Sequence, residues 1–190
     1  KLHITGVSSA TTIELIRSAK KEGLAISCSV TPTHLFYCDE DMTTYNTNLK
    51  VIPPVRTKAD RDALRAAVVD GTIDCIASHH APQDWDHKVC EFEYAEFGNI
   101  GLQTTYSALE QTVPGLQPEQ ISNLLSGNAR QIFALPTVSI EEGQAAELTI
   151  FNRTEMTTLT PENNKSKSSN SAFMNQSLTG KMIATINKGI

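Results

Sequence analysis

The chain has 190 residues, 39% of them hydrophobic, and a formal net charge of -5 at pH 7. This length can bury the core of one domain and leaves room for a small appendage. The acidic balance argues against nucleic acid and anionic membranes as partners, and no apolar run is long enough to span a bilayer. Neither an initiator methionine nor a signal peptide opens the sequence, so we interpret it as part of a longer, cytoplasmic protein.

The cysteines give no sign of a metal site or a disulfide framework. The chain has four of them without any C-x-x-C spacing, and Cys28 and Cys75 lie inside apolar runs. We therefore expect reduced thiols that pack as small hydrophobic side chains, as is usual in a reducing compartment.

Strand and helix signals alternate through the first part of the chain. Residues 2–4 predict a strand end, and a helix capped by Thr11 or Thr12 runs through Lys21. The later predicted elements are a strand at 24–30, a helix opened by Thr57 and closed near Gly71, a strand at 73–77, and helices at 102–112, 118–125 and 128–133. Strands that alternate with helices indicate βαβ units and a parallel sheet.

The pattern changes after Pro136. A turn followed by a strand is predicted at 143–151, and a second β-segment at 179–189. Between them, residues 163–171 are rich in Ser, Asn and Lys and offer no apolar face, which predicts a disordered loop.

One segment carries more chemical information than the rest. Ser78-His79-His80-Ala81-Pro82 directly follows the apolar run at 73–77. In α/β barrels, catalytic side chains stand at the C-terminal ends of the strands, and this segment has that position.

This segment and several others, in the same order, resemble the C-terminal half of dihydroorotases of the long, bacterial multifunctional-complex type. These are zinc amidohydrolases that open or close the dihydroorotate ring. The other similar segments are Val-Ser-Ser at 7–9, Val-Thr-Pro-Thr-His-Leu at 30–35, and the segments 48–56, 70–77, 97–104 and 166–170.

The resemblance implies an α/β fold, the C-terminal part of a TIM-type (β/α)8 barrel at 1–136 and strands of a small β-domain at 137–190. Because a complete barrel takes about 250 residues, we expect this chain to supply only the later strands. The first partner of the chain would then be the N-terminal half of the same protein, which carries the family's His-x-His metal pair.

The resemblance also places zinc ligands at positions 6, 34 and 79. Gly6 has no side chain to coordinate a metal, and His3 cannot replace it because an odd offset along a strand points to the opposite face. His34 is retained, so His34 and His79 are expected to face one barrel mouth with a gap beside Gly6. Two protein ligands are too few for a stable zinc site, so we expect zinc to be absent or weakly bound.

His79 occupies the position of the family's catalytic Asp, which binds metal and accepts a proton from the bridging hydroxide. An imidazole can bind a metal or act as a base, but it brings no negative charge, and beside a dication it holds a proton poorly. The neighbouring His80 is expected to pack or to support the site indirectly, since adjacent side chains on a strand diverge.

The implied substrate-binding positions have changed as well. Ile52 stands where the family has Asn, and Gln83 where it has the His that contacts the substrate carboxylate. Phe97 and Gly98, whose equivalents contact the ring through backbone groups, are retained.

These changes favour a non-catalytic member of the family, similar to inactive homologues that assemble with aspartate transcarbamoylase, and we expect a homo-oligomer. Two alternatives stay open. The full-length protein is an active zinc-dependent dihydroorotase, or it hydrolyses another cyclic amide or imide. The loop at 85–94 is interpreted either as a contact surface over the barrel mouth or as an ordinary solvated loop.

Overall fold

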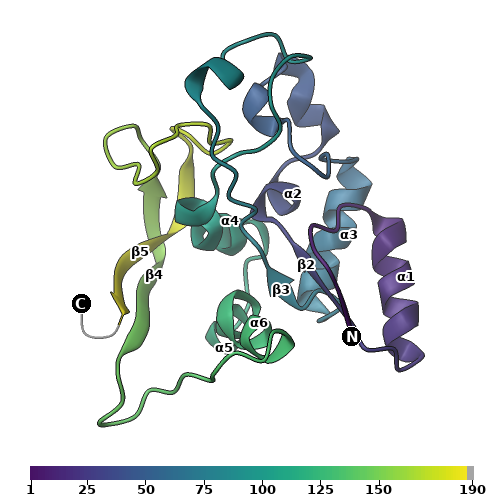
Figure 1. Cartoon of the computed structure of the whole chain (residues 1–190), viewed down its shortest axis with the longest axis vertical. Coiled ribbons are helices and arrows are strands. Elements are labelled where there is room, and N and C mark those ends of the chain that lie inside the picture. Colours follow the sequence, from purple (N-terminus) through teal and green to yellow (C-terminus); the bar gives the residue numbers. More distant parts are fainter. Residues whose placement is uncertain (188–190) are drawn as a thin grey trace.

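The computed structural model describes residues 1–187, and a parallel sheet forms the centre of its larger part. The strands β1 (Leu2–Ile4), β2 (Ile26–Val30) and β3 (Cys75–Ile76) pair in parallel in the order β1-β2-β3. The helices α1 (Ala10–Lys21) and α3 (Lys58–Val69) make the connections between successive strands and pack against each other (Figure 1). The predicted βαβ arrangement is therefore confirmed.

Local sequence explains where these two helices begin. The hydroxyl of Thr57 accepts a hydrogen bond from the Asp60 N–H while the Asp60 carboxylate accepts from the Thr57 N–H, the capping box predicted at the start of α3. For α1 the predicted caps Thr11 and Thr12 are wrong, because Ser9 is in extended conformation and its hydroxyl accepts from the Thr12 N–H. The cap of α1 therefore lies earlier than the apolar periodicity alone suggested.

The short helix α2 (Pro32–Phe36) was not expected from the sequence. Thr31 caps it, and Pro32 occupies its first position, where the missing N–H costs nothing. Five residues are too few to show a helical period, so only the Thr-Pro start could have revealed it. This helix matters because it follows β2 directly and carries His34.

The predicted helices in the middle of the chain are present, with altered bounds. A 3-10 turn, η4 (Leu102–Thr104), leads into α4 (Thr105–Thr112). After α5 (Pro118–Ser122) a π-helical turn, η5 (Asn123–Gly127), continues directly into α6 (Asn128–Ile132), so the two predicted helices join. Shorter 3-10 turns occur at η1 (Asp39–Thr44), η2 (Thr47–Leu49) and η3 (Trp85–His87).

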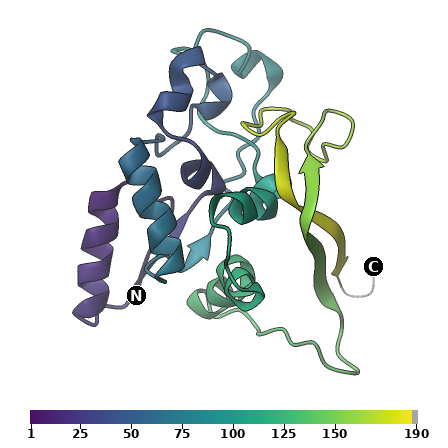
Figure 2. The same ribbon diagram turned by 180° about the vertical axis from the view of Figure 1, so that it is seen from behind.

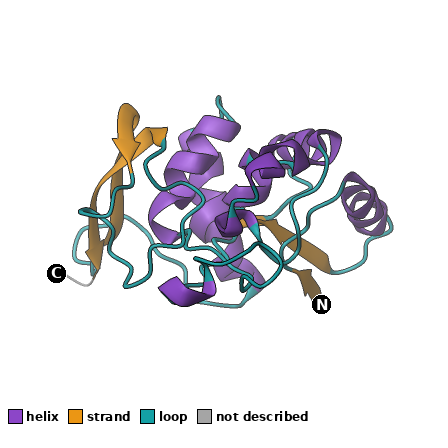
Figure 3. Cartoon of the chain, turned by 90° about the horizontal axis from the view of Figure 1, so that it is seen from above, coloured by secondary structure: helices purple, strands orange, loops and turns teal. Residues whose placement is uncertain are grey.

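A two-stranded antiparallel ribbon forms the second part of the molecule. It consists of β4 (Glu147–Thr158) and β5 (Ser177–Asn187), which pair only with each other among residues 1–187. The ribbon packs against α4 through β5 (Figure 2). A layer of helices separates the ribbon from the parallel sheet (Figure 3). Both predicted β-segments are confirmed up to Asn187, whereas residues 188 and 189 of the second one lie outside the described part of the chain. The domain division near residue 136 stays a prediction.

The polar tract at 163–171 does not form the disordered loop that its composition predicted. Asn170 and Ser171 are buried, and the Asn170 side-chain amide donates to the carbonyl oxygens of Ala81 (3.0 Å) and Gly98 (3.2 Å). The Ile100 N–H donates to the carbonyl of Asn170 at 3.0 Å. The tract is ordered because its amides satisfy backbone groups of segments far away in the sequence, which composition does not reveal.

The main hydrophobic core lies between the sheet and its helices and includes Val30, Leu35, Leu64, Ile76 and Leu109. All four cysteines are free thiols, and Cys28, Cys38 and Cys75 are buried, while the reduced state stays a prediction. Within residues 1–187, none of the helices combines the length and the apolar character that a membrane crossing requires.

Candidate functional site

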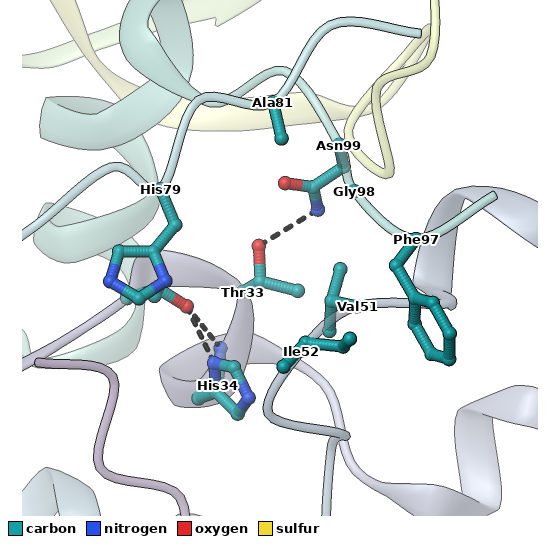
Figure 4. A pocket seen from close by; sticks show the side chains of 10 residues that line it. Thr33, His34, Val51, Ile52, His79, Ala81, Phe97, Gly98 and Asn99 are labelled. Atoms are coloured by element: carbon teal, nitrogen blue, oxygen red, sulfur yellow. Dashed lines mark hydrogen bonds between the residues drawn. The ribbon is translucent and has the colours of Figure 1, made fainter.

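A cavity of about 290 Å³ opens where β2 and β3 end, the edge at which parallel α/β folds place their sites. Figure 4 shows the side chains around it. They come from the β2–α2 junction, from the segment after η2, from the segment after β3 and from the loop that precedes η4. The lining residues are Thr31, Thr33, His34, Val51, Ile52, His79, Ala81, Phe97, Gly98 and Asn99.

His34 is buried in the wall of this cavity, and both of its ring nitrogens are hydrogen-bonded. Nε2 lies 2.8 Å from the carbonyl oxygen of Pro53, which can only accept, so Nε2 carries the hydrogen. Nδ1 lies 2.6 Å from Oγ1 of Thr31 and accepts from that hydroxyl. Burial lowers the pKa of His34, although its hydrogen bond to Pro53 acts in the opposite direction. The ring is therefore neutral and has no free nitrogen.

His79 faces the same cavity from the end of β3, with its backbone in the left-handed region at φ 44°. Its Nε2 lies 2.8 Å from Oγ1 of Thr5, and desolvation lowers its pKa. Figure 4 shows the ring near His34, with one nitrogen turned toward the cavity and the other away from it. The two histidines thus share one pocket, and the Nδ1 atom of His79 faces into it.

The gap that we expected beside Gly6 does not exist. Gly6 has φ +72°, and a Cβ atom at this position would lie 2.6 Å from Cε1 of His79. Carbon atoms do not approach so closely, so the imidazole of His79 occupies the space where a side chain at position 6 would project. The two departures from the family pattern therefore fit each other sterically.

The residues around the cavity do not fit a zinc ion. Stable protein zinc sites have three or four ligands, yet residues 1–187 contain no cluster of three or more His, Cys, Asp or Glu side chains suited to a metal. Both nitrogens of His34 are engaged, which leaves Nδ1 of His79 as the single imidazole nitrogen of this pocket without a partner among the described residues.

Two neighbouring histidines take no direct part in the pocket. Nδ1 of His80 accepts from the N–H groups of Gly101 (3.2 Å) and Leu102 (3.4 Å), so this side chain orders the start of η4, as a supporting residue would. His3 also lies outside the lining of the cavity, and its ring contacts Ser27 and Ser29 of β2.

The implied substrate-binding positions are largely occupied by contacts within the chain. The Gln83 side-chain amide donates to the Phe97 carbonyl at 2.9 Å and does not line the cavity, while Ile52 lines its mouth and is 64% exposed. The Gly98 N–H donates to the Lys50 carbonyl at 2.9 Å. Thus the side chains offer no charge to a ligand, and most backbone groups expected to contact one are already paired.

Two lysines hold the loop that carries Phe97 and Gly98. Lys88 is buried, and its ammonium donates to the carbonyls of Glu96 (2.7 Å) and Gly98 (3.1 Å). Lys50 donates to the carbonyls of Phe92 and Glu93, and its ammonium lies 5.0 Å from the ring centre of Phe97. Sequence reasoning missed both roles, because lysine in a polar loop is normally exposed and no local pattern marks the exceptions.

Comparison with known proteins gives the fold class first. No family model matches the chain. The structure of a D-hydantoinase superposes with a TM-score of 0.87 at 20% identity, over 100% of this chain and 44% of that chain. The L-hydantoinase (dihydropyrimidinase) from Arthrobacter aurescens gives 0.87 at 24% identity, over 99% and 44%. The fold is therefore that of the C-terminal part of these hydantoinases, a TIM-type (β/α)8 barrel, as predicted.

Sequence relatives then give the family. Proteins named dihydroorotase match this chain at 34% identity in Fusobacterium nucleatum, covering 98% of the chain and 45% of the relative. The one in Caldanaerobacter subterraneus is 38% identical (100% and 44%), and the one in Mycobacterium tuberculosis 37% (100% and 45%). The chain belongs to the dihydroorotase family as the counterpart of the C-terminal part of these proteins. It spans less than half of their length.

The close approach of Gly6 and His79 leads to a stability prediction. Gly6→Ala should lower the free energy of unfolding by more than Gly23→Ala, because both glycines have positive φ but a Cβ at Gly23 meets nothing within 4 Å. Backbone strain alone should cost about 1 kcal/mol in each variant. Adding His79→Ala should recover the excess cost of Gly6→Ala, and urea unfolding measures all three. Equal losses in the two single variants would contradict the steric account.

A second prediction concerns Lys88. Desolvation by burial lowers its pKa from 10.5 to about 8. Between these values the unfolded chain holds more protons than the folded one, so this lysine makes the free energy of unfolding rise with pH from about 8 to 10.5. Lys88→Met should lose that rise, whereas Lys58→Met, at an exposed lysine of α3, should keep it. Chemical unfolding across this pH range gives the comparison, and parallel curves for wild type and Lys88→Met would argue against a buried ammonium.

Proposed function

We propose that the chain is part of a dihydroorotase-family protein of pyrimidine biosynthesis whose metal site has degenerated, and that it is non-catalytic. The observation that carries this proposal is the position of the His79 ring, whose Cε1 atom lies 2.6 Å from where a Cβ of Gly6 would be. The side chain at the family's Asp position therefore fills the room of the lost ligand.

The chemistry of the pocket supports the same conclusion. Metal-assisted hydrolysis needs an activated water and a base that accepts its proton. Here the two imidazoles are neutral, three of their four nitrogens are hydrogen-bonded, and the cavity lining contains no carboxylate. The pocket thus lacks the negative charge that would offset zinc and promote proton transfer from its water.

One observation favours an active enzyme as the second candidate. His34 is retained, and Nδ1 of His79 remains uncommitted in the same cavity. If an N-terminal half supplied further ligands, Nδ1 of His79 would contribute to a mononuclear zinc site, and Nδ1 of His34 would join it by giving up its hydrogen bond to Thr31. The exposed Ile52 at the mouth would then suit a different cyclic amide or imide better than dihydroorotate.

We propose that the non-catalytic barrel serves as a structural partner in an assembly. Within residues 1–187, β1 and β3 each have one edge that pairs with no strand, and an N-terminal half-barrel of the same protein would cover them. The loop at 85–94 exposes Trp85 (68%), Val89 (57%) and Tyr94 (70%). Aromatic side chains of this kind are typical of interfaces, so we assign this loop to contacts with aspartate transcarbamoylase in a homo-oligomeric assembly.

Restoring the ligands tests the degenerate site. In the full-length protein, Gly6→His combined with His79→Asp should bind zinc, measured by calorimetry, while Gly6→His alone should destabilise the fold because of the His79 ring. Turnover of dihydroorotate should stay low until Ile52→Asn and Gln83→His are added, since poor positioning alone costs on the order of 10²-fold. An unmodified full-length protein that turns over dihydroorotate at about 1 s⁻¹ or faster would disprove the proposal.

The partner is tested separately. Full-length protein mixed with aspartate transcarbamoylase from the same organism should co-sediment in analytical ultracentrifugation. The double variant Trp85→Ser with Tyr94→Ser should weaken the complex at least tenfold, because aromatic anchors dominate interface energies. Exposed Leu15→Ser on α1 is the matched control and should have no effect. Separate sedimentation of the two wild-type proteins would count against this partner.

A further inference from the structure

A continuous chain of hydrogen bonds connects side chains of β1 and β2 and ends at His79. Ser27 Oγ lies 2.9 Å from Nδ1 of His3, and Nε2 of His3 lies 3.3 Å from Ser29 Oγ. The Ser29 hydroxyl donates to Thr5 Oγ1 at 3.0 Å, and Thr5 Oγ1 lies 2.8 Å from Nε2 of His79. Three hydroxyls and two imidazoles from β1, β2 and the segments after β1 and β3 thus form one network.

The network has a direction. Each hydroxyl has a single hydrogen, and a neutral imidazole has one N–H and one acceptor nitrogen. Ser29 donates to Thr5 Oγ1, and Nε2 of His79 is the other side-chain partner of that oxygen among residues 1–187. If the Thr5 hydrogen continues in the same direction, it goes to Nε2, and the hydrogen of a neutral His79 resides on Nδ1, which faces the cavity. Because the Ser29 hydrogen is used for Thr5, Ser29 accepts from Nε2 of His3, and Ser27 then donates to Nδ1 of a neutral His3.

A second donor faces the same cavity. Thr33 Oγ1 accepts from the side-chain amide of Asn99 at 3.0 Å, and its own hydrogen has no acceptor among residues 1–187. Thr33 and His79 both line this pocket (Figure 4). We assign the N–H of His79 and the hydroxyl of Thr33 as the two hydrogen-bond donors that the pocket offers to a guest molecule.

Apolar side chains make up much of the remaining lining, and none of the lining residues within 1–187 is a Lys, Arg, Asp or Glu. Val51, Ile52, Ala81 and Phe97 line the cavity, and its volume of about 290 Å³ suits a small molecule. The nearby ammonium groups of Lys50 and Lys88 are turned to loop carbonyls. A buried anion without a cationic partner is costly, so an uncharged carbonyl group beside an apolar body matches this pocket best.

We propose that the Ser27–His3–Ser29–Thr5 network fixes His79 as a neutral donor through Nδ1, and that the pocket thereby binds a small uncharged carbonyl compound in place of a metal ion. Thr5 and Ser29 are positioning residues in this scheme, because they act on the ligand only through His79. The inference rests on the proposed function in one respect, since it requires a pocket without zinc.

Nitrogen NMR of the imidazoles in the full-length protein at about pH 8, where an ordinary histidine is neutral, tests the network. Wild-type His79 should be protonated on Nδ1. Thr5→Val should move the hydrogen to Nε2, and Ser29→Ala should shift the ratio of tautomers in the same direction although Ser29 does not touch His79. Thr33→Val, in the same pocket but outside the network, should leave the tautomer unchanged. A wild-type His79 protonated on Nε2, or no response to Ser29→Ala, would overturn the proposal.

Benzamide and benzoate, which share a ring and differ in charge, test the ligand class. Benzamide should shift the Nδ1–H resonance of His79 with a Kd on the order of 1 mM, as expected of a fragment, and benzoate should bind at least tenfold more weakly. Thr33→Val should weaken benzamide binding severalfold. Tighter binding of benzoate, no binding of benzamide, or loss of the Nδ1 hydrogen to equimolar zinc would refute the inference. Turnover of dihydroorotate by a protein that keeps this hydrogen would refute only the proposed function.

Discussion

The contact between the His79 ring and Gly6 constrains everything else at the barrel mouth. The glycine has positive φ and no Cβ, and the imidazole lies over it and bonds to Thr5 next in the chain. A ligand side chain at position 6 and the present orientation of His79 exclude each other. In the proposed degenerate site, one steric relation thus connects the residues at two of the implied ligand positions.

Polar contacts from distant segments give this site its rigidity. Asn170 and Lys88 both donate to the Gly98 carbonyl, and Asn99 reaches Thr33 at the start of α2. The pocket wall is therefore held by amides and one buried ammonium. These contacts do not depend on catalysis, because fold and activity are separable.

The sequence predicts the elements whose cause is local and misses those whose cause is distant. The capping box at Thr57 and the apolar strand runs are local, so α3 and the parallel strands were predictable. The helix α2 was too short to have a period, and the order of the Asn170 segment depends on partners on the other side of the pocket. Likewise, positive φ is uncommon for histidine, so no pattern indicated that His79 would turn over Gly6.

For the candidate site, the sequence identified the altered positions but not their consequences. Gly6 and His79 stood out by comparison with the family motif, and His34 was expected in the same mouth. The network through His3, Thr5 and Ser29 was not foreseen, since its members are joined only by strand pairing.

Zinc-edge anomalous diffraction from full-length crystals grown with zinc tests the account most directly. The account predicts no metal peak between His34 and His79, with the His79 ring over Gly6. Two well-occupied zinc ions bound by these histidines would contradict it.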